Sequence, residues 1–235
     1  MKMKQPTTTL HCFSPPVMIL TFFIELALAV WTLWRYKHTA LVRLVAAILV
    51  CLAIFQLAEF TICESWLGLD QLTWARIGYV AITALPALGL HLLTRIAKVN
   101  APWIVRTTYT IMVIFMAYFL LAGHGISATI CGGNYVLFET NLRATSWYTL
   151  YYYGLEIGAI ITAYVLARKT KDKQQRQALY GLTAAYMMLI IPVATANLIN
   201  PKLVHAIPSI MCGFAVFLAL TVALYVLPRT ASVRA

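Results

Sequence analysis

Acidic residues are scarce in this chain: only 7 of its 235 residues are Asp or Glu, and all charged residues together make up 11%. A soluble globular domain has about 25% charged residues. The hydrophobic content of 62% is also more than a fold of this size can hide from water. These values exclude an ordinary soluble domain and favour a protein whose apolar surface lies in lipid.

Several chemical signatures are missing as well. The five cysteines include no CxxC pair, and no two of the five histidines are three or four residues apart, so no metal or haem site is indicated. Neither GxSxG nor HExxH occurs. The last apolar run, 204–227, has no lysine for a retinal Schiff base. We therefore expect no enzymatic activity, no metal and no other cofactor.

What the chain does have is seven apolar runs, each long enough to cross a bilayer as a helix. Because backbone polar groups in lipid must be satisfied internally, helices are favoured over open strands. We predict an all-α membrane protein, a seven-transmembrane helical bundle over 16–227, between an outer segment 1–15 and a cytoplasmic tail 228–235. The predicted spans are 16–34, 42–63, 74–95, 103–123, 146–168, 177–199 and 204–227.

The basic residues orient this bundle. The formal net charge is +11, but most of the 18 Lys and Arg residues lie in alternate loops, within 35–43, 95–106 and 168–176, and in the tail. Short clusters between apolar runs do not form a nucleic-acid surface. The positive-inside rule then places the N-terminus outside and the C-terminus in the cytoplasm. We expect contact with anionic lipid headgroups at the inner face, and the bias suits a bacterial inner membrane.

The one long connection, 124–145, lies outside in this layout. Its strand-like segments 126–130 and 135–138 flank Gly132 and Gly133, which predicts a short β-hairpin lying over the bundle; an irregular loop is the alternative. Cys63 at the end of the second span and Cys131 in this loop are candidates for a disulfide in an oxidising compartment. The alternative is that they are separate apolar residues.

Ionisable side chains within spans are costly in lipid and are functional candidates. Glu25 and Glu156 fall near mid-depth and have no evident cationic partner in the sequence. One outward-facing polar cavity would unite the candidate ligand-binding residues, which are Glu25, Gln56, Glu59, Tyr152, Glu156 and Asn197. The alternative is neutral carboxylic acids hydrogen-bonded to Tyr, Thr or water. For the aromatic group at 147–153, an interfacial belt is the favoured interpretation.

One pattern goes beyond hydropathy. Glu59 is followed by Trp74, Tyr79 and Pro86 in the segment WARIGYVAITALPALGLHLL; a long loop, a helix opening with Trp147 and Tyr148, and a basic loop RKTKDKQQRQALYGL come next. Over roughly 15–227 the chain resembles the N-terminal seven-transmembrane sensor region of bacterial histidine kinases and related signalling proteins. That family passes its signal from the last helix to a cytoplasmic output domain, and here only 228–235 follow.

The resemblance implies a non-enzymatic sensory or ligand-binding membrane module. Its output would pass through a separate cytoplasmic signalling partner, or through a domain that has been removed. Two other classes stay open. In a small transporter or channel, the buried acids would relay protons or cations. In an accessory subunit of a membrane complex, the polar residues within the lipid would face a partner.

Overall fold

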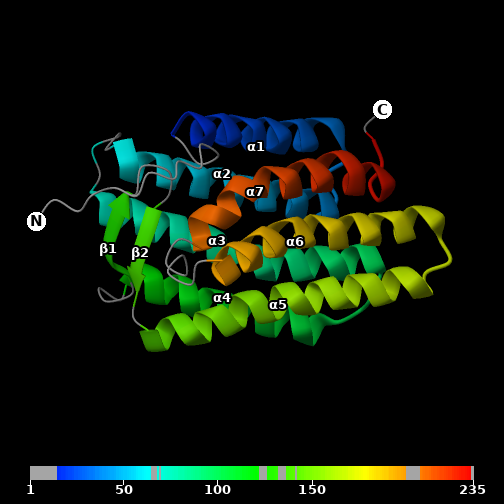
Figure 1. Cartoon of the computed structure of the whole chain (residues 1–235). Helices are drawn as coiled ribbons and strands as arrows, with labels where there is room; N and C mark the ends of the chain where they lie inside the picture. The colour runs from blue at the N-terminus through cyan, green and yellow to red at the C-terminus, as the bar shows by residue number, and fades with distance from the viewer. Residues whose placement is uncertain are drawn as a thin grey trace, which may run out of the picture.

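The computed structural model describes residues 15–64, 68, 70–121, 126–131, 136–140, 142–199 and 207–233, and it forms a bundle of long helices with a small sheet at one end (Figure 1). The predicted outer segment therefore lies almost wholly outside the described residues, as do 204–206 of the last predicted span. The elements are α1 Pro15–Arg35, α2 Ala40–Glu64, α3 Gln71–Ala97, α4 Pro102–Leu121, β1 Ile126–Cys131, β2 Val136–Thr140, α5 Leu142–Lys169, α6 Lys173–Ile199, α7 Ile207–Leu220, the π-helix η3 Thr221–Val226 and the 3₁₀ turn η4 Leu227–Arg229.

Six of the described helices, α1 to α6, are long and apolar enough to cross a membrane. This confirms the expected all-α membrane bundle in its main feature, and the chain is an integral membrane protein by helix length and composition. α7 has 14 residues and continues without a break into η3 and η4.

Several helices extend past the apolar runs that predicted them, because their ends are stabilised by polar groups. α3 begins at Gln71 rather than at residue 74, since the Asp70 side chain caps it by accepting from the Thr73 amide at 3.1 Å. Hydrogen bonds from Thr73 also hold the pKa of Asp70 below its usual value. In the same way the Asp172 carboxyl accepts from the Gln174 amide at 2.9 Å at the start of α6.

The helices differ in how much surface they bury. α2 packs against both α1 and α3, and α3 also contacts α4, α5 and α6, so α3 is the central helix. α4 lies at the periphery and buries only Thr108 and Phe119. A peripheral helix with an apolar outer face is stable when that face lies in lipid.

The two strands lie at one end of the bundle (Figure 1). β1 and β2 pair antiparallel, β1 contacts α2 and α3, and β2 contacts α2. Ile126 of β1 is fully buried. The residues 132–135, which would form the turn of the predicted hairpin, lie outside the described residues.

Cys63, near the end of α2, is disulfide-bonded, whereas Cys51 is free. The side chain of Cys131 lies outside the described side chains, so the Cys63–Cys131 pairing stays a prediction. The contact between α2 and β1 brings the two segments that carry these cysteines together.

Candidate functional site

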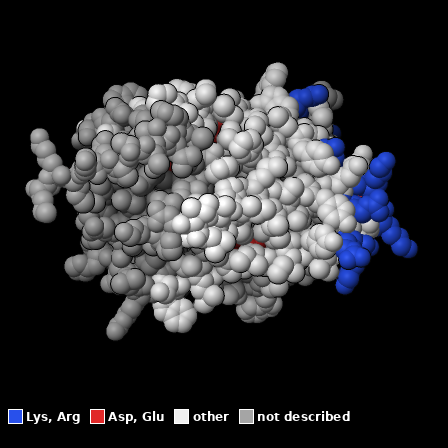
Figure 2. All heavy atoms as spheres, in the orientation of Figure 1, with Lys and Arg blue, Asp and Glu red and all other residues white. Residues whose placement is uncertain are grey.

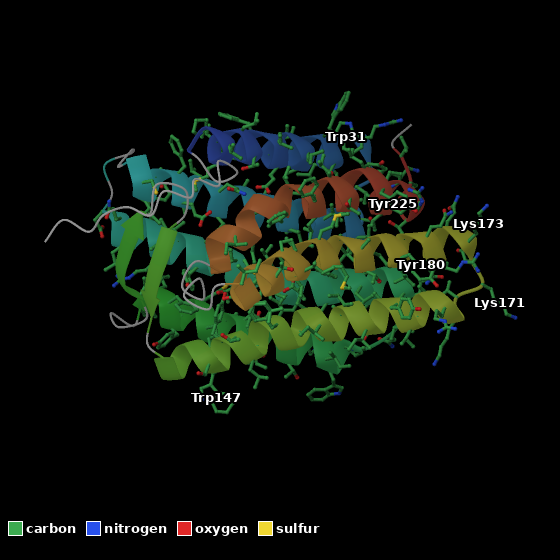
Figure 3. The ribbon with its side chains drawn as sticks, in the orientation of Figure 1. Trp31, Trp147, Lys171, Lys173, Tyr180 and Tyr225 are labelled. Atoms are coloured by element: carbon green, nitrogen blue, oxygen red, sulfur yellow. The ribbon has the colours of Figure 1, made fainter. Side chains whose placement is uncertain are left out.

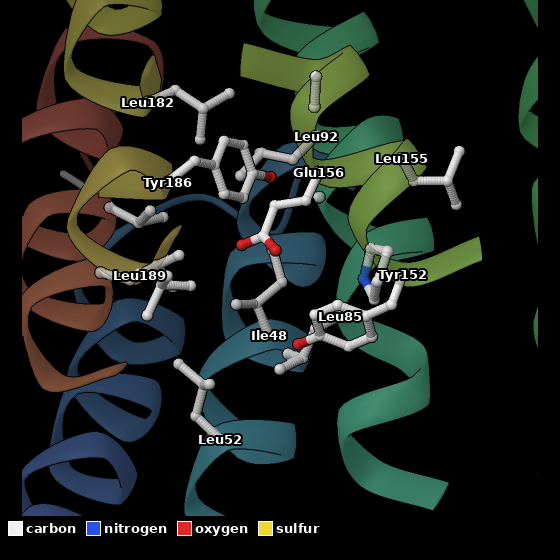
Figure 4. Close-up of a pocket in the computed structure, with 15 residues that line it drawn as sticks. Ile48, Leu52, Leu85, Leu92, Tyr152, Leu155, Glu156, Leu182, Tyr186 and Leu189 are labelled. Carbon is white, nitrogen blue, oxygen red and sulfur yellow. The ribbon is translucent and has the colours of Figure 1, made fainter. Parts of the chain in front are cut away.

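A small cavity of about 30 Å³ lies inside the bundle, enclosed by side chains of α2, α3, α5, α6 and the α7–η3 run (Figure 4). A cavity needs about 10–15 Å³ to hold one water molecule, so this one has room for about two groups of that size. Most of its lining is aliphatic. The polar exceptions are Tyr152, Glu156 and Tyr186.

Glu156 is the ionisable group of this cavity. It is 5% exposed, and its Oε2 has no hydrogen-bond partner within the described part of the chain. The lining includes no Lys or Arg. Figure 4 shows the carboxyl of Glu156 directed into the space between Tyr186 and Tyr152.

Gly89 and Pro86 shape the wall that α3 contributes. The hydroxyl of Tyr186 lies so close to Gly89 that a Cβ at position 89 would overlap it. Pro86 has no amide hydrogen to donate in the helix, and it lies one turn before Gly89 on the same face. The absence of a side chain at Gly89 therefore lets the α6 tyrosine approach the α3 backbone closely.

The tyrosines at the start of α5 form a buried cluster, not the interfacial belt that the sequence favoured. Tyr148, Tyr151 and Tyr152 are buried, while Trp147 is 68% exposed. The Tyr148 ring packs against Phe119 with ring centroids 4.9 Å apart. The Tyr151 hydroxyl donates to the Thr83 carbonyl at 2.8 Å. These contacts join α5 to α3 and α4 next to the cavity.

Of the six predicted site residues, the structure brings Tyr152 and Glu156 to the cavity. Gln56 and Glu59 of α2 are buried, and both have interaction partners, but neither lines it. Asn197 lies near the end of α6, where its side-chain amide donates to the Val193 carbonyl at 3.0 Å. Four of the six residues therefore do not line this cavity, and the convergence of all six on one polar cavity stays a prediction.

Glu25 forms a separate buried site in α1. Its exposed fraction is 0%, and neither carboxyl oxygen has a hydrogen-bond partner among the described residues. α1 packs on α2 and α7, and Glu25 is not among the residues that line the cavity. The two acids that the sequence singled out therefore lie in different environments.

Sequence reasoning missed Tyr186 and Gly89. A signal for Gly89 was present, because it follows the in-helix Pro86 by three residues and so shares its face. Tyr186 gave no signal, since one tyrosine in an apolar helix is ordinary. Within the described residues no cluster of three His, Cys, Asp or Glu side chains has a metal-binding arrangement.

The end of the bundle opposite the strands is basic. Figure 2 shows the Lys and Arg side chains of the described residues on the visible face gathered there, and Lys171 and Lys173 lie at this end in Figure 3. Here η4 carries Arg229, whose guanidinium lies 3.5 Å from the centre of the Tyr225 ring. Arg229 Nε also donates to Gln177 of α6 at 3.3 Å.

The C-terminal segment docks at this same end. Tyr36 and Val233 form an isolated antiparallel bridge, and the Lys37 amide donates to the Ser232 carbonyl at 3.1 Å. Tyr36 is buried and packs edge-on against Trp31, with ring centroids 5.6 Å apart. The segment after η4 is therefore held against the α1–α2 turn.

Comparison with protein-family models finds no family that matches this chain, and a search among curated proteins finds no match to it either.

Proposed function

We propose that the chain is a non-enzymatic sensory or ligand-binding membrane module, in which occupancy of the Glu156 cavity alters the position of the C-terminal segment. One observation carries the proposal: Leu218 and Val222 of the α7–η3 run line the cavity. The same helical run continues to Tyr225 and Arg229 at the basic end. A ligand that fits one arrangement of this helix better than another shifts the population toward it.

The output belongs to a cytoplasmic signalling partner. The docked segment Thr230–Val233 and the basic α5–α6 loop are the surfaces that such a partner would meet. The resemblance to histidine-kinase sensor regions rests on Glu59, on the spacing of Trp74, Tyr79 and Pro86, and on the order of the helices. Trp74, Tyr79 and Pro86 are buried on α3, the helix that forms one wall of the cavity.

The α7–η3–η4 run is the seventh span in this proposal. The bundle then has its N-terminus outside and its C-terminus in the cytoplasm, because the basic end shown in Figure 2 is the end that meets anionic headgroups at the inner face. The same bias favours a bacterial inner membrane. The strands and Cys63 then lie on the outer, oxidising side, where a Cys63–Cys131 disulfide is stable.

Cys131→Ser tests the orientation and the disulfide together. We expect the wild-type chain to give a Cys63–Cys131 cross-linked peptide under non-reducing conditions. In the variant, a freed Cys63 thiol should react with a membrane-impermeant maleimide added to the outside of intact cells. Peptide mass spectrometry measures both. Labelling that occurs only in inverted vesicles would reverse the orientation, and a Cys63 that stays oxidised in the variant would identify a different partner.

Glu156→Gln tests the sensory function, because it changes the charge of the cavity while keeping the size of the side chain. We expect the distance between spin labels at His38→Cys and Ser232→Cys to change by on the order of 5 Å, one helical turn. Both positions are exposed. Native cysteines that are free are replaced by alanine in this background. Because Lys37 and Ser232 are hydrogen-bonded neighbours, the dipolar broadening of continuous-wave electron paramagnetic resonance spectra measures the distance.

Gly158→Ala is the matched control for this measurement. Gly158 also lies on α5, and nothing lies within 4 Å of the Cβ that alanine would add. An unchanged distance in Glu156→Gln, or the same change in both variants, contradicts the coupling of the cavity to the tail.

A small transporter is the second candidate, favoured by the burial of both Glu25 and Glu156 within apolar helices. It predicts a proton or cation flux in proteoliposomes that Glu156→Gln abolishes. The sensory proposal predicts no flux through the wild-type chain or the Glu156→Gln variant.

A further inference from the structure

The buried carboxyl of Glu156 lies in surroundings that offer it no positive charge. An ionised carboxylate in an apolar interior is strongly unfavourable unless a proton or a cation neutralises it. No basic side chain lines the cavity, and Oε2 has no hydrogen-bond partner among the described residues. The ionised form of this carboxyl is therefore stabilised by an occupant that carries positive charge or donates hydrogen bonds, and such an occupant replaces the neutralising proton.

Two aromatic rings accompany this carboxyl. Tyr152 of α5 and Tyr186 of α6 line the same cavity, and Figure 4 shows them on either side of the Glu156 carboxyl. The face of a tyrosine ring attracts a cation, and the attraction strengthens where water is excluded. A carboxylate with two tyrosines is a suitable environment for an ammonium group.

The size and lining of the cavity narrow the choice of cation. Its volume of about 30 Å³ accommodates about two groups the size of water. Ca²⁺ and Mg²⁺ take about six or more oxygen ligands, and this lining offers only one carboxyl and two hydroxyls, with no His or Cys for Zn²⁺. The remaining wall is aliphatic, with Leu85, Leu189 and Val222, so a methyl group is accommodated there.

We propose that the Glu156 cavity binds a small ammonium-type cation, either ammonium itself with one water molecule or methylammonium. An N–H of the cation donates to the Glu156 carboxylate, and the methyl group or the water occupies the aliphatic part. The identification of this cation as the signal rests on the proposed sensory function. The binding site itself rests only on the cavity.

The full chain in detergent, titrated with methylammonium chloride, tests this inference. We expect the melting temperature to rise by about 3–6 °C at saturating methylammonium. Tetramethylammonium chloride and sodium chloride at equal ionic strength should give no such rise, because the first is too large and the second needs more oxygen ligands. Glu156→Gln should lose the effect, and Gly158→Ala should keep it.

A second measurement uses only the wild-type chain, so its result does not depend on whether the Glu156→Gln variant folds. Radiolabelled methylammonium should bind at about one equivalent per chain in equilibrium dialysis, and unlabelled ammonium should displace it. No saturable binding, or an equal melting-temperature rise with sodium or in Glu156→Gln, overturns the inference.

The cation-binding site and the sensory function are contradicted by different results. Methylammonium binding that leaves the distance between labels at 38 and 232 unchanged supports the site and overturns the sensory role. A change in that distance in Glu156→Gln, together with a wild-type chain that binds no methylammonium, overturns the ligand assignment and leaves the sensory role standing.

Discussion

Gly89→Ala is expected to lower the free energy of unfolding by about 1–3 kcal/mol, the usual cost of adding a methyl group to a well-packed interior. The new Cβ would overlap the Tyr186 hydroxyl, so either the ring rotates or α3 and α6 move apart. Both movements alter the cavity, since Gly89 and Tyr186 line it together. Denaturation in mixed micelles measures the stability, and methylammonium titration of the same sample measures the cavity.

Gly158→Ala is again the control, because its added methyl group meets nothing within 4 Å. Alanine is the better helix former by about 0.5–1 kcal/mol, so this variant should be as stable as the wild type or slightly more stable. Equal losses at positions 89 and 158 would mean that the cost comes from the helix backbone and not from the contact with Tyr186.

The contrast between these glycines shows what the sequence can and cannot reveal. Hydropathy located α1 to α6 within a few residues, because the bilayer demands about 20 apolar residues in a spanning helix. The ends were placed less well. α6 begins at Lys173 rather than at residue 177, since the apolar run marks the part of the helix in lipid and not the polar turn that precedes it.

Which face of a helix meets the bundle was harder to predict. Trp147 and Tyr148 are adjacent and both aromatic, yet the first is 68% exposed and the second 8%. Consecutive residues point in directions about 100° apart on an α-helix, and hydropathy does not discriminate between them when all faces are apolar. The sequence therefore predicted an interfacial belt of aromatic residues. The structure instead has a buried cluster of tyrosines that packs on Phe119.

The candidate site was predictable only in part. Glu156 was predicted because an ionisable side chain within an apolar span is energetically costly in lipid. Tyr152 was predicted because it lies one helical turn before Glu156 on α5. Tyr186 and Gly89 come from helices far apart in sequence, and their relation depends on how α3 and α6 pack. Glu25 satisfied the same burial criterion as Glu156, but it lies apart from the cavity.

Glu25→Met is expected to raise the free energy of unfolding by about 1–3 kcal/mol, the typical cost of leaving a buried polar group unsatisfied. Glu25 is 0% exposed, and neither of its carboxyl oxygens has a hydrogen-bond partner among the described residues. Replacing a buried ionic group with an apolar one of similar volume is often neutral or stabilising. Methionine is unbranched and of similar length, so it should occupy the same space. Denaturation in mixed micelles measures the change.

The sign of this change in the free energy of unfolding distinguishes a functional role of Glu25 from a structural one. Glu25→Ala is the companion variant, because it removes the carboxyl but leaves an empty space that costs about 2–5 kcal/mol for large-to-small changes. If methionine stabilises and alanine destabilises, the carboxyl is retained at the expense of stability. A residue retained on those terms in a lipid-spanning helix serves function rather than folding. If methionine destabilises while Glu25→Gln does not, hydrogen bonds formed in the membrane hold α1 in place, and the residue is structural.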